Sequence, residues 1–321
     1  MEKDALTNSA PLVSICIAAY NVEKYILDSI NSIICQTFNE IEIVIVDDGS
    51  TDGTGKILQS ISDKRVKVLT SENRGQCAAL NLAYSNSSGS FIKFMDADDI
   101  ISSNFIELQL TKIRDIPDSI ASAEWGRFYN DNLSTFRKNE EKVWQDMKPI
   151  DWLTESLKDG ANMMQCALFL IPRHLLERSG LWNVNLTLIN DFEFFIRVLL
   201  SASLINFTPG AILYYRSGIS NSVSDQKTSK AYQSALMSVQ LGTRTLLNFE
   251  NSERVRLAAA NAFQLWAYQF YSTEPELYKV AQDEVDRLGG STLPFPSGGV
   301  TKFLSSIIGW KLGLKIKKLF K

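Results

Sequence analysis

Short apolar runs alternate with helical patterns over the first hundred residues of the chain. Runs typical of buried strands occupy residues 12–18, 41–46, 66–69 and 91–95. Between them, apolar residues recur at helical spacing over residues 21–35, 54–60 and 76–84. Asn21 is expected to cap the first of these helices. Because strands that alternate with helices at this spacing are joined by crossover connections, the pattern predicts an α/β fold with a doubly wound, mostly parallel sheet.

The alternation weakens beyond residue 100. Residues 123–129 have the pattern of a strand, residues 151–157 that of a short helix, and the apolar segment 163–171 is expected to return to the core. A further helix is expected over residues 190–199. Its buried side should carry Phe192, Phe195, Ile196 and Leu199.

The C-terminal part has a helical character of its own. Residues 226–288 have the pattern of two or three helices, with packing positions at Leu236, Val239, Leu246, Leu257, Phe263, Trp266 and Phe270. A linker with glycine and proline follows, and then a lysine-rich tail. We therefore expect a sheet domain over residues 1–222, a helical C-terminal region over residues 223–290, and a linker with a basic amphipathic tail over residues 291–321.

The tail suits two environments. Its apolar residues repeat at helical spacing and are followed by a lysine-rich end; they are Phe303, Leu304, Ile307, Ile308 and Trp310. Such an element would place its lysines at the headgroups of an anionic membrane surface and Trp310 at the interface. Gly309 and Gly313 interrupt the apolar face, so a helix that packs on the body or pairs with an acidic partner is an equal alternative.

Composition places the chain among globular proteins, because 321 residues with 45% hydrophobic content can bury a sizeable core. A net charge of −3 argues against a general nucleic-acid binder. The four cysteines lie in apolar stretches without CxxC spacing, so we expect buried, reduced thiols with no disulfide and no zinc. No signal segment or bilayer-spanning run is evident. The expected location is cytoplasmic, with peripheral attachment to the inner face of the cell membrane if the tail binds lipid.

Acidic side chains follow two of the predicted strands. Asp96 and Asp98 come at the end of the fourth run, and the loop that holds Asp48 follows the second. Ligands bind at the carboxyl ends of strands in open α/β sheets, and carboxylates crowded there need a cation or hydrogen-bond donors. An Asp-x-Asp pair suits Mg²⁺ or Mn²⁺ that is held partly by a substrate's phosphates. Taken alone, either loop would more readily be interpreted as a helix cap or a turn, but two such loops after adjacent strands favour a ligand site.

Asp191 and His174 are two further polar residues that could belong to a site. Asp191 lies in the first turn of the predicted helix 190–199, where the helix dipole favours a carboxylate that can point into a cleft. The alternative is that Asp191 only caps the helix. His174, the single histidine, follows Pro172 at an apparent helix start and is expected on the surface.

Five motifs occur in a fixed order along the chain. They occupy residues 12–21, 44–52, 73–76 with 81, 94–99 and 190–197. Together they resemble the family 2 glycosyltransferases, which have the GT-A fold, over roughly residues 10–220. The resemblance implies that residues 1–222 form a catalytic, nucleotide-sugar-binding domain. It implies an inverting transferase that moves a sugar from a nucleotide-diphosphate donor to a saccharide or lipid-linked acceptor, by family analogy in cell-surface polysaccharide or glycolipid synthesis.

The resemblance also implies roles for single residues. Ala19 and Asn21 match positions beside the nucleotide. Asp48 is similar to the acid that reads the base, and Asp96 to the acid near the ribose and the donor sugar. Asp98 resembles the ligand of the Mg²⁺ or Mn²⁺ ion that bridges the diphosphate.

Asp191 resembles the general base, but the chain departs from the family at two nearby points. Asn190 precedes Asp191, whereas the family usually has Glu there. Family members often carry a histidine shortly after a Tyr-Arg pair, whereas Tyr215-Arg216 is followed by Gly218. This chain therefore lacks a residue that often completes the metal shell in the family, and Arg216 could offset diphosphate charge.

The chemistry of sugar transfer needs the same groups. Loss of a nucleoside diphosphate builds negative charge, which a metal at Asp98 would neutralise. A carboxylate such as Asp191 can take the proton of the attacking hydroxyl, and direct attack inverts the anomeric centre. A nucleotidyltransferase would be expected to show a glycine-rich, basic phosphate loop near the first strand, and a dinucleotide-dependent oxidoreductase a G-x-G-x-x-G turn; the sequence has neither. An inactive nucleotide-sugar-binding or scaffolding relative is the main alternative, and a nucleotidyltransferase is a less favoured one.

Overall fold

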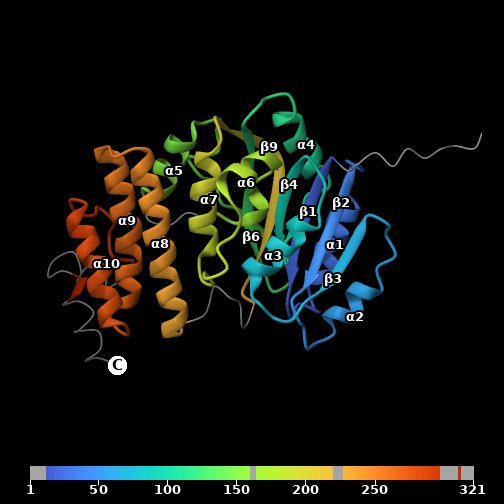
Figure 1. Ribbon diagram of the computed structural model, residues 1–321, viewed down its shortest axis with the longest axis horizontal. Coiled ribbons are helices and arrows are strands. Elements are labelled where there is room, and N and C mark those ends of the chain that lie inside the picture. Colours follow the sequence, from blue (N-terminus) through green and yellow to red (C-terminus); the bar gives the residue numbers. More distant parts are fainter. Residues whose placement is uncertain (1–11, 160–163, 220–226, 297–309, 312–321) are drawn as a thin grey trace, which may run out of the picture.

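The computed structural model describes residues 12–159, 164–219, 227–296 and 310–311. Its first layer is a five-stranded sheet in the order β3-β2-β1-β4-β8 (Figure 1). The strands are β1 (Val13–Ala19), β2 (Ile41–Asp47), β3 (Val66–Thr70), β4 (Phe91–Asp96) and β8 (Ile171–Pro172). β1 to β4 pair in parallel, and β8 pairs antiparallel with β4. The four predicted strands and their mostly parallel arrangement are confirmed.

Three helices make the crossover connections between these strands: α1 (Ile26–Ile34), α2 (Thr54–Gln59) and α3 (Gln76–Ser85). The prediction that Asn21 caps the first helix is wrong, because α1 begins only after Tyr25. The Asn21 side chain instead accepts a hydrogen bond from the amide of Thr51 (2.8 Å). Asn21 has a φ of +52°, a left-handed conformation that asparagine tolerates, and it turns the chain away from the end of β1.

The central position of β1 defines where the loops of the sheet meet. The chain runs from β1 outward to β2 and β3, and then returns to pair β4 on the other side of β1. Such a reversal is the switch point at which open α/β sheets bind ligands. The two acidic loops were expected to follow adjacent strands. This expectation is wrong, because β1 lies between β2 and β4. They flank the end of β1 from its two sides.

A second sheet, which the sequence pattern did not reveal, packs beside the first in the order β5-β9-β6-β7. Its strands are β5 (Ile100–Ile101), β6 (Ser119–Tyr129), β7 (Asn132–Lys138) and β9 (Leu204–Ser217). The strand expected over residues 123–129 is thus present but starts earlier. β6 and β9 pair in parallel over almost their full length, and β9 ends beside the loop after β4.

Four helices and a 3₁₀ turn complete this half of the molecule: α4 (Phe105–Ile113), α5 (Pro149–Leu157), η1 (Cys166–Leu168), α6 (Arg173–Ser179) and α7 (Asn190–Leu200). The described part of segment 163–171 is buried, as predicted. In α7 the expected buried face is partly wrong, because Phe192 is only half-buried and Phe194 is fully buried. Phe194 stacks on Trp182 with ring centroids 3.8 Å apart. The prediction of four buried thiols also needs one correction, since Cys35 is exposed.

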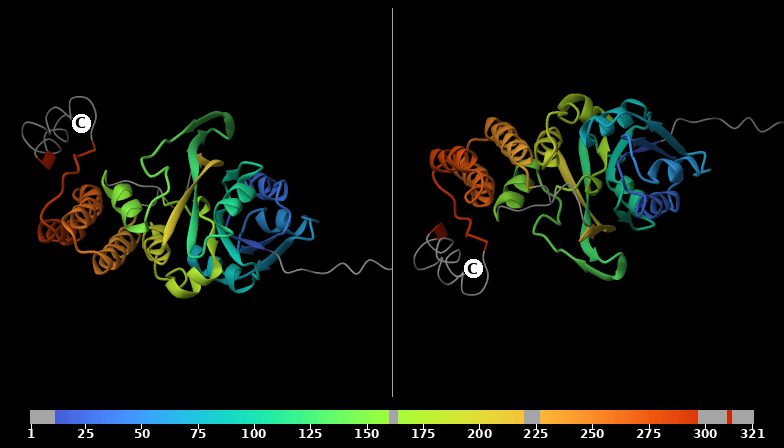
Figure 2. Two further views of the ribbon diagram at one scale, coloured as in Figure 1. Left: turned by 90° about the horizontal axis from the view of Figure 1, so that it is seen from above. Right: turned by 90° about the horizontal axis from the view of Figure 1, so that it is seen from below.

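The C-terminal region forms three helices, α8 (Ser229–Phe249), α9 (Glu253–Phe270) and α10 (Pro275–Arg287), which confirms the expected helical extension. They lie at the opposite end of the molecule from β2 and β3 (Figure 1, Figure 2). Their side chains build a second apolar core, while α8 also packs on α7 and α9 on α5. The expected boundary after residue 222 lies outside the described residues.

Most of the predicted basic tail also lies outside the described residues. Trp310 is described, and its ring packs among Tyr268, Tyr271 and Phe295, with centroid distances of 4.8, 4.7 and 5.4 Å. This contact agrees with the alternative in which the tail packs on the body. Within the described ranges, no helix has both the length and the apolar character needed to cross a bilayer.

Gly89 offers a test of the packing between β1 and β4. A Cβ atom at this position would lie 2.7 Å from the Ser14 amide nitrogen and 2.9 Å from the Val13 carbonyl carbon, and backbone atoms cannot move aside cheaply. We expect Gly89→Ala to lower the free energy of unfolding by about 1–3 kcal/mol, measured by urea denaturation. Ser90→Ala, at the exposed neighbouring position, is the control and should change little. Equal stabilities of the two variants would contradict this packing.

Candidate active site

Three aspartates gather where β4 ends. Asp96 is the last residue of β4, and Asp98 and Asp99 lie in the turn that follows. Gln76, at the start of α3, donates a hydrogen bond from Nε2 to Oδ1 of Asp96 (2.9 Å). Gln165, just before η1, donates from Nε2 to Oδ2 of Asp96 (2.9 Å) and to Oδ2 of Asp99 (2.6 Å). Two side-chain amides therefore hold the acidic turn.

Crowding of these carboxyl groups changes their acidity. Burial, and then repulsion from Asp96, raises the pKa of Asp98 to about 7. Burial also raises the pKa of Asp96, and it raises the pKa of Asp99 well above its usual range, with the charges of Asp98 and Asp96 adding to the effect. A cation bound at this turn would favour the ionised carboxylates.

Arg216 reaches this turn from β9. Its backbone amide donates to Oδ1 of Asp99 (2.9 Å), and its Nε donates to the carbonyl of Asp98 (2.7 Å). The guanidinium is buried between the rings of Tyr25 and Phe128, each 4.8 Å from its central carbon. It also forms ion pairs with Asp131 and Asp28, at 3.6 Å for the latter. Arg216 thus fixes the turn that carries Asp98.

Asp191 lies in the first turn of α7, as predicted, and its Oδ1 accepts a hydrogen bond from the amide of Phe192 (2.9 Å). Burial raises the pKa of Asp191 to about 6. Its negative charge contributes, after burial, to the raised pKa of Asp96, so the two carboxyl groups share one electrostatic environment. At neutral pH most of the Asp191 carboxyl groups are ionised.

Gln76 connects the two halves of the site. While its Nε2 donates to Asp96, its Oε1 accepts a hydrogen bond from Nδ2 of Asn190 (3.1 Å). Asn190 Nδ2 also lies 3.1 Å from Sγ of Cys77. The asparagine that stands where the related family has glutamate therefore supplies a donor that Gln76 can accept. A glutamate would place a second acceptor against Gln76 Oε1.

The nucleotide-side candidates form a connected set of loops. Asp48 is buried, and its carboxylate accepts hydrogen bonds from the amides of Arg74 (2.9 Å) and Gly75 (2.8 Å). Its own amide donates to the carbonyl of Ala19 (2.9 Å). Asn21 joins the same set through its bond to Thr51. Asp48 thus shapes the loop before α3, and its role toward a base stays a prediction.

The described residues show where His174 lies and whether metal-ligating side chains are grouped. His174 is 54% exposed at its side chain and pairs with Asp118 at 2.6 Å, so its predicted surface position is confirmed. Within residues 12–159, 164–219, 227–296 and 310–311, no three His, Cys, Asp or Glu side chains are grouped to hold a metal. Gly218 has a φ of +80° and carries no ligand.

Comparison with known proteins decides the family. Residues 14–179, just over half of the 321-residue chain, match the profile described as "Glycosyl transferase family 2". The chain belongs to glycosyl transferase family 2. The matched region includes Asp48, Asp96 and Asp98, whereas Asp191 and Arg216 lie beyond it. The assignment of Asp191 therefore rests on the motif resemblance, and that of Arg216 on its hydrogen bonds to the turn after β4.

Curated relatives of the chain include other glycosyltransferases. The glycosyltransferases GlyA and GlyG of Streptococcus pneumoniae serotype 4 are 39% and 38% identical over 38% and 37% of this chain, which spans 17% and 40% of their respective lengths. An uncharacterized glycosyltransferase of Haemophilus influenzae is 31% identical over 58% of this chain and 71% of that relative.

Solved structures show the fold of this family 2 chain. TarS 1–349 of S. aureus, solved in complex with UDP-GlcNAc, aligns with a TM-score of 0.62 and 19% identity over 87% of this chain and 92% of that chain. The uncomplexed TarS 1–349 aligns with a TM-score of 0.64 and 20% identity, covering 92% of this chain and 81% of that chain. The predicted GT-A fold with a helical extension is thereby confirmed.

The raised pKa of Asp98 predicts a pH-dependent stability. Since its folded-state pKa of about 7 lies above the ordinary value, ionisation of Asp98 costs folding free energy as pH rises through that range. We expect Asp98→Asn, in a metal chelator, to melt a few degrees above the parent at pH 8 and to exceed the parent by clearly less at pH 5, because the penalty grows as pH rises from about 4 through about 7. Calorimetry at the two pH values measures this. A difference that stays constant with pH would contradict the proposed repulsion.

Proposed function

We propose that this chain is an inverting glycosyltransferase that moves a sugar from a nucleotide-diphosphate donor to a hydroxyl acceptor, with Asp191 as general base. The observation that carries the proposal is the bridge from Asp96 through Gln76 to Asn190, which brings the acidic turn and the start of α7 into one site. Membership of family 2 and the TarS complexes with UDP-GlcNAc and with UDP support the class of donor.

On the donor side, we assign the nucleotide to the loops that contain Ala19, Asn21 and Asp48, and the ribose and donor sugar to Asp96. These residues lie at or just after the carboxyl ends of three parallel strands, around the switch point of the sheet. The protein backbone can approach a bound nucleotide closely there. Arg216 supports this side by holding the turn after β4 and by offsetting negative charge near it.

Asp98 is the proposed ligand of Mg²⁺ or Mn²⁺. Its hard oxygen donors fit such an ion. Burial, and then the charge of Asp96, raise the pKa of its carboxyl, and a bound cation would favour the ionised form. The diphosphate of the donor would supply further ligands. When bound, the ion would stabilise the charge that develops on the departing diphosphate.

Asp191 supplies the base on the acceptor side. As the acceptor oxygen bonds to the anomeric carbon, the bond from that carbon to the diphosphate oxygen breaks and the hydroxyl proton passes to the Asp191 carboxylate. The raised pKa of about 6 suits this task, because the group is still ionised at neutral pH yet more basic than an exposed aspartate. A single displacement of this kind inverts the anomeric configuration.

The acceptor is proposed to be a saccharide or a lipid-linked saccharide, in the synthesis of cell-surface polysaccharide or glycolipid. This part of the proposal rests on family analogy. Transfer assays with a panel of nucleotide sugars, with and without Mn²⁺, test the function directly and separate an enzyme from an inactive binding relative. NMR of the product's anomeric proton shows whether the configuration is inverted.

Metal dependence is the next prediction. Mn²⁺ together with the matching nucleotide sugar should raise the melting temperature of the parent, because ligands that bind only the folded state stabilise it. Asp98→Asn should lose most of this rise and nearly all transfer, while keeping the fold. A variant with the parent's response to Mn²⁺ would remove Asp98 from the metal site.

Replacement of the base gives a sharper test. Asp191→Asn keeps the size of the side chain but removes its basicity, so turnover should fall by about 10²-fold or more while donor affinity survives. Donor affinity is measured by calorimetric titration, and turnover by product formation. Asp191→Ala is the control for a mere helix cap, whose loss would cost about 1 kcal/mol of stability without a specific loss of turnover.

The pH profile adds an independent measurement to the same prediction. Since Asp191 must be ionised to accept a proton and its pKa is raised to about 6, turnover of the parent should fall as pH drops through about 6 and level off above it. The residual activity of Asp191→Asn should lack this acid limb. A parent profile that is flat between pH 5 and 8 would count against Asp191 as the base.

A further inference from the structure

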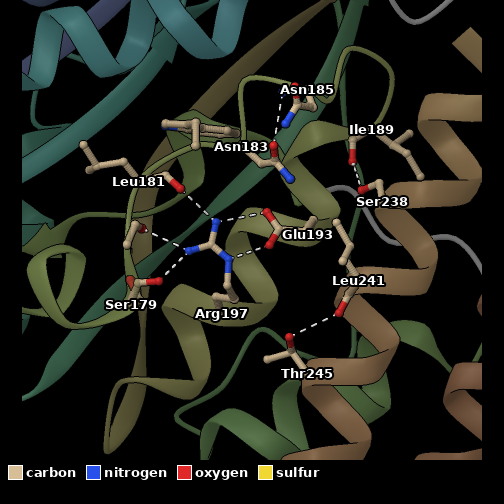
Figure 3. A network of polar contacts seen from close by, with 12 residues as sticks. Ser179, Leu181, Asn183, Asn185, Ile189, Glu193, Arg197, Ser238, Leu241 and Thr245 are labelled. Carbon is tan, nitrogen blue, oxygen red and sulfur yellow. Dashed lines mark hydrogen bonds and ion pairs between the residues drawn. The ribbon is translucent and has the colours of Figure 1, made fainter. Parts of the chain in front are cut away.

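Two serine hydroxyls of α8 hydrogen-bond the residues that lead into α7. Ser234 Oγ accepts hydrogen bonds from the amides of Thr187 (2.8 Å) and Leu188 (3.3 Å). One helical turn later, Ser238 Oγ donates to the carbonyl of Ile189 (2.6 Å), as Figure 3 shows. Both serines are buried, and residues four apart lie on the same face of a helix. The C-terminal region therefore holds the backbone just before Asp191.

Ile189 adopts a conformation that needs such support. Its φ of +49° and ψ of +37° lie in the left-handed region, which a β-branched residue rarely enters. A backbone of this kind costs about 1–3 kcal/mol and persists only where the surroundings impose it. The same carbonyl that Ser238 binds also accepts the amide of Phe192 (3.1 Å), in the first turn of α7. Asp191 lies between these two residues.

The segment is held from two sides. On one side Leu188 packs into the apolar core of the C-terminal helices. On the other side Asn190 is bound to Gln76 and Cys77 of α3. α8 also approaches α7 closely at Gly242, where a Cβ atom would lie 2.7 Å from the ring of Phe192. The start of α7 is thus clamped between the nucleotide-side layer and the C-terminal helices.

We propose that Ser238 is a positioning residue for the general base: through the carbonyl of Ile189 it sets the direction in which the first turn of α7 presents the Asp191 carboxylate. The inference rests on the proposed function of Asp191. It makes the C-terminal helical region a required part of the catalytic unit. A small displacement of a catalytic group is costly, because proton transfer needs the base within hydrogen-bond reach of the acceptor hydroxyl.

Ser238→Ala tests this role in the full chain. We expect turnover to fall by about tenfold, a loss in the range that misplacement of a catalytic group produces, with donor affinity within about twofold of the parent. Thr245→Ala is the matched control, because Thr245 Oγ1 donates to the carbonyl of Leu241 within α8 (3.2 Å) and does not touch the loop (Figure 3). The acid limb of the pH profile should stay at the parental pH, since the base itself is unchanged. Equal turnover of the two variants would overturn the proposal.

Amide hydrogen exchange followed by mass spectrometry gives a second measurement that needs no substrate. Ser238→Ala should speed exchange in residues 186–192 by several-fold and leave residues 76–85 unchanged. If Ser238→Ala does not fold, Ser238→Cys keeps the volume with a weaker donor and should shift both readouts the same way. Unchanged exchange would refute the clamp, and faster exchange with parental turnover would refute positioning. A parent without transfer activity would refute the proposed function, and exchange would still decide the clamp.

Discussion

The arrangement of the site depends on hydrogen bonds from two glutamine amides to the carboxylates after β4. Beyond the effect of burial, the charge of Asp96 helps to raise the pKa of Asp98, and the charges of Asp98 and Asp96 help to raise that of Asp99, so an acidic turn of this kind would tend to open. Gln76 and Gln165 oppose that tendency because each donates into the cluster. Gln165 is itself fixed, since its Oε1 accepts a hydrogen bond from the amide of Ala167 (2.7 Å).

A buried lysine on β4 also supports the acidic turn, by binding the segment that follows Gln165. Lys93, on β4, donates from Nζ to the carbonyls of Ala167 (2.6 Å) and Phe169 (3.2 Å), and its side chain is fully buried. Burial holds the pKa of Lys93 well below its usual range. The η1 turn, which begins directly after Gln165, is therefore tied to β4, the strand that ends with Asp96.

Gln76 links the acidic turn to the start of α7, on the proposed acceptor side. Because Gln76 has a donor at one end and an acceptor at the other, it can link Asp96 to Asn190 only if residue 190 offers a donor. The departure from the usual Glu-Asp pair is thus compatible with the neighbouring network. The C-terminal helices complete the support through Ser238 and Ile189, so the base is held by elements from three parts of the chain.

The first four strands, the acidic residues at their ends and the C-terminal helices could be predicted from the sequence. The apolar runs predicted β1 to β4 because strands buried on both faces have near-continuous apolar residues. The acids at the ends of those runs then indicated the edge of the sheet that binds ligands. Long helices such as α8 to α10 were also evident from their spacing. The second sheet was not, since β7 is mostly exposed and β9 mixes polar and apolar residues without a clear period.

By itself the sequence determined the order of strands and helices along the chain, the family motifs and the identities of the acidic residues. Only the tertiary structure decided which of them meet. Neither Gln165 nor Ser238 was identified from the sequence, because their partners lie 69 and 49 residues away. Local patterns record periodicity and caps, whereas a hydrogen bond between distant segments depends on the packing of whole elements, which no window of sequence contains.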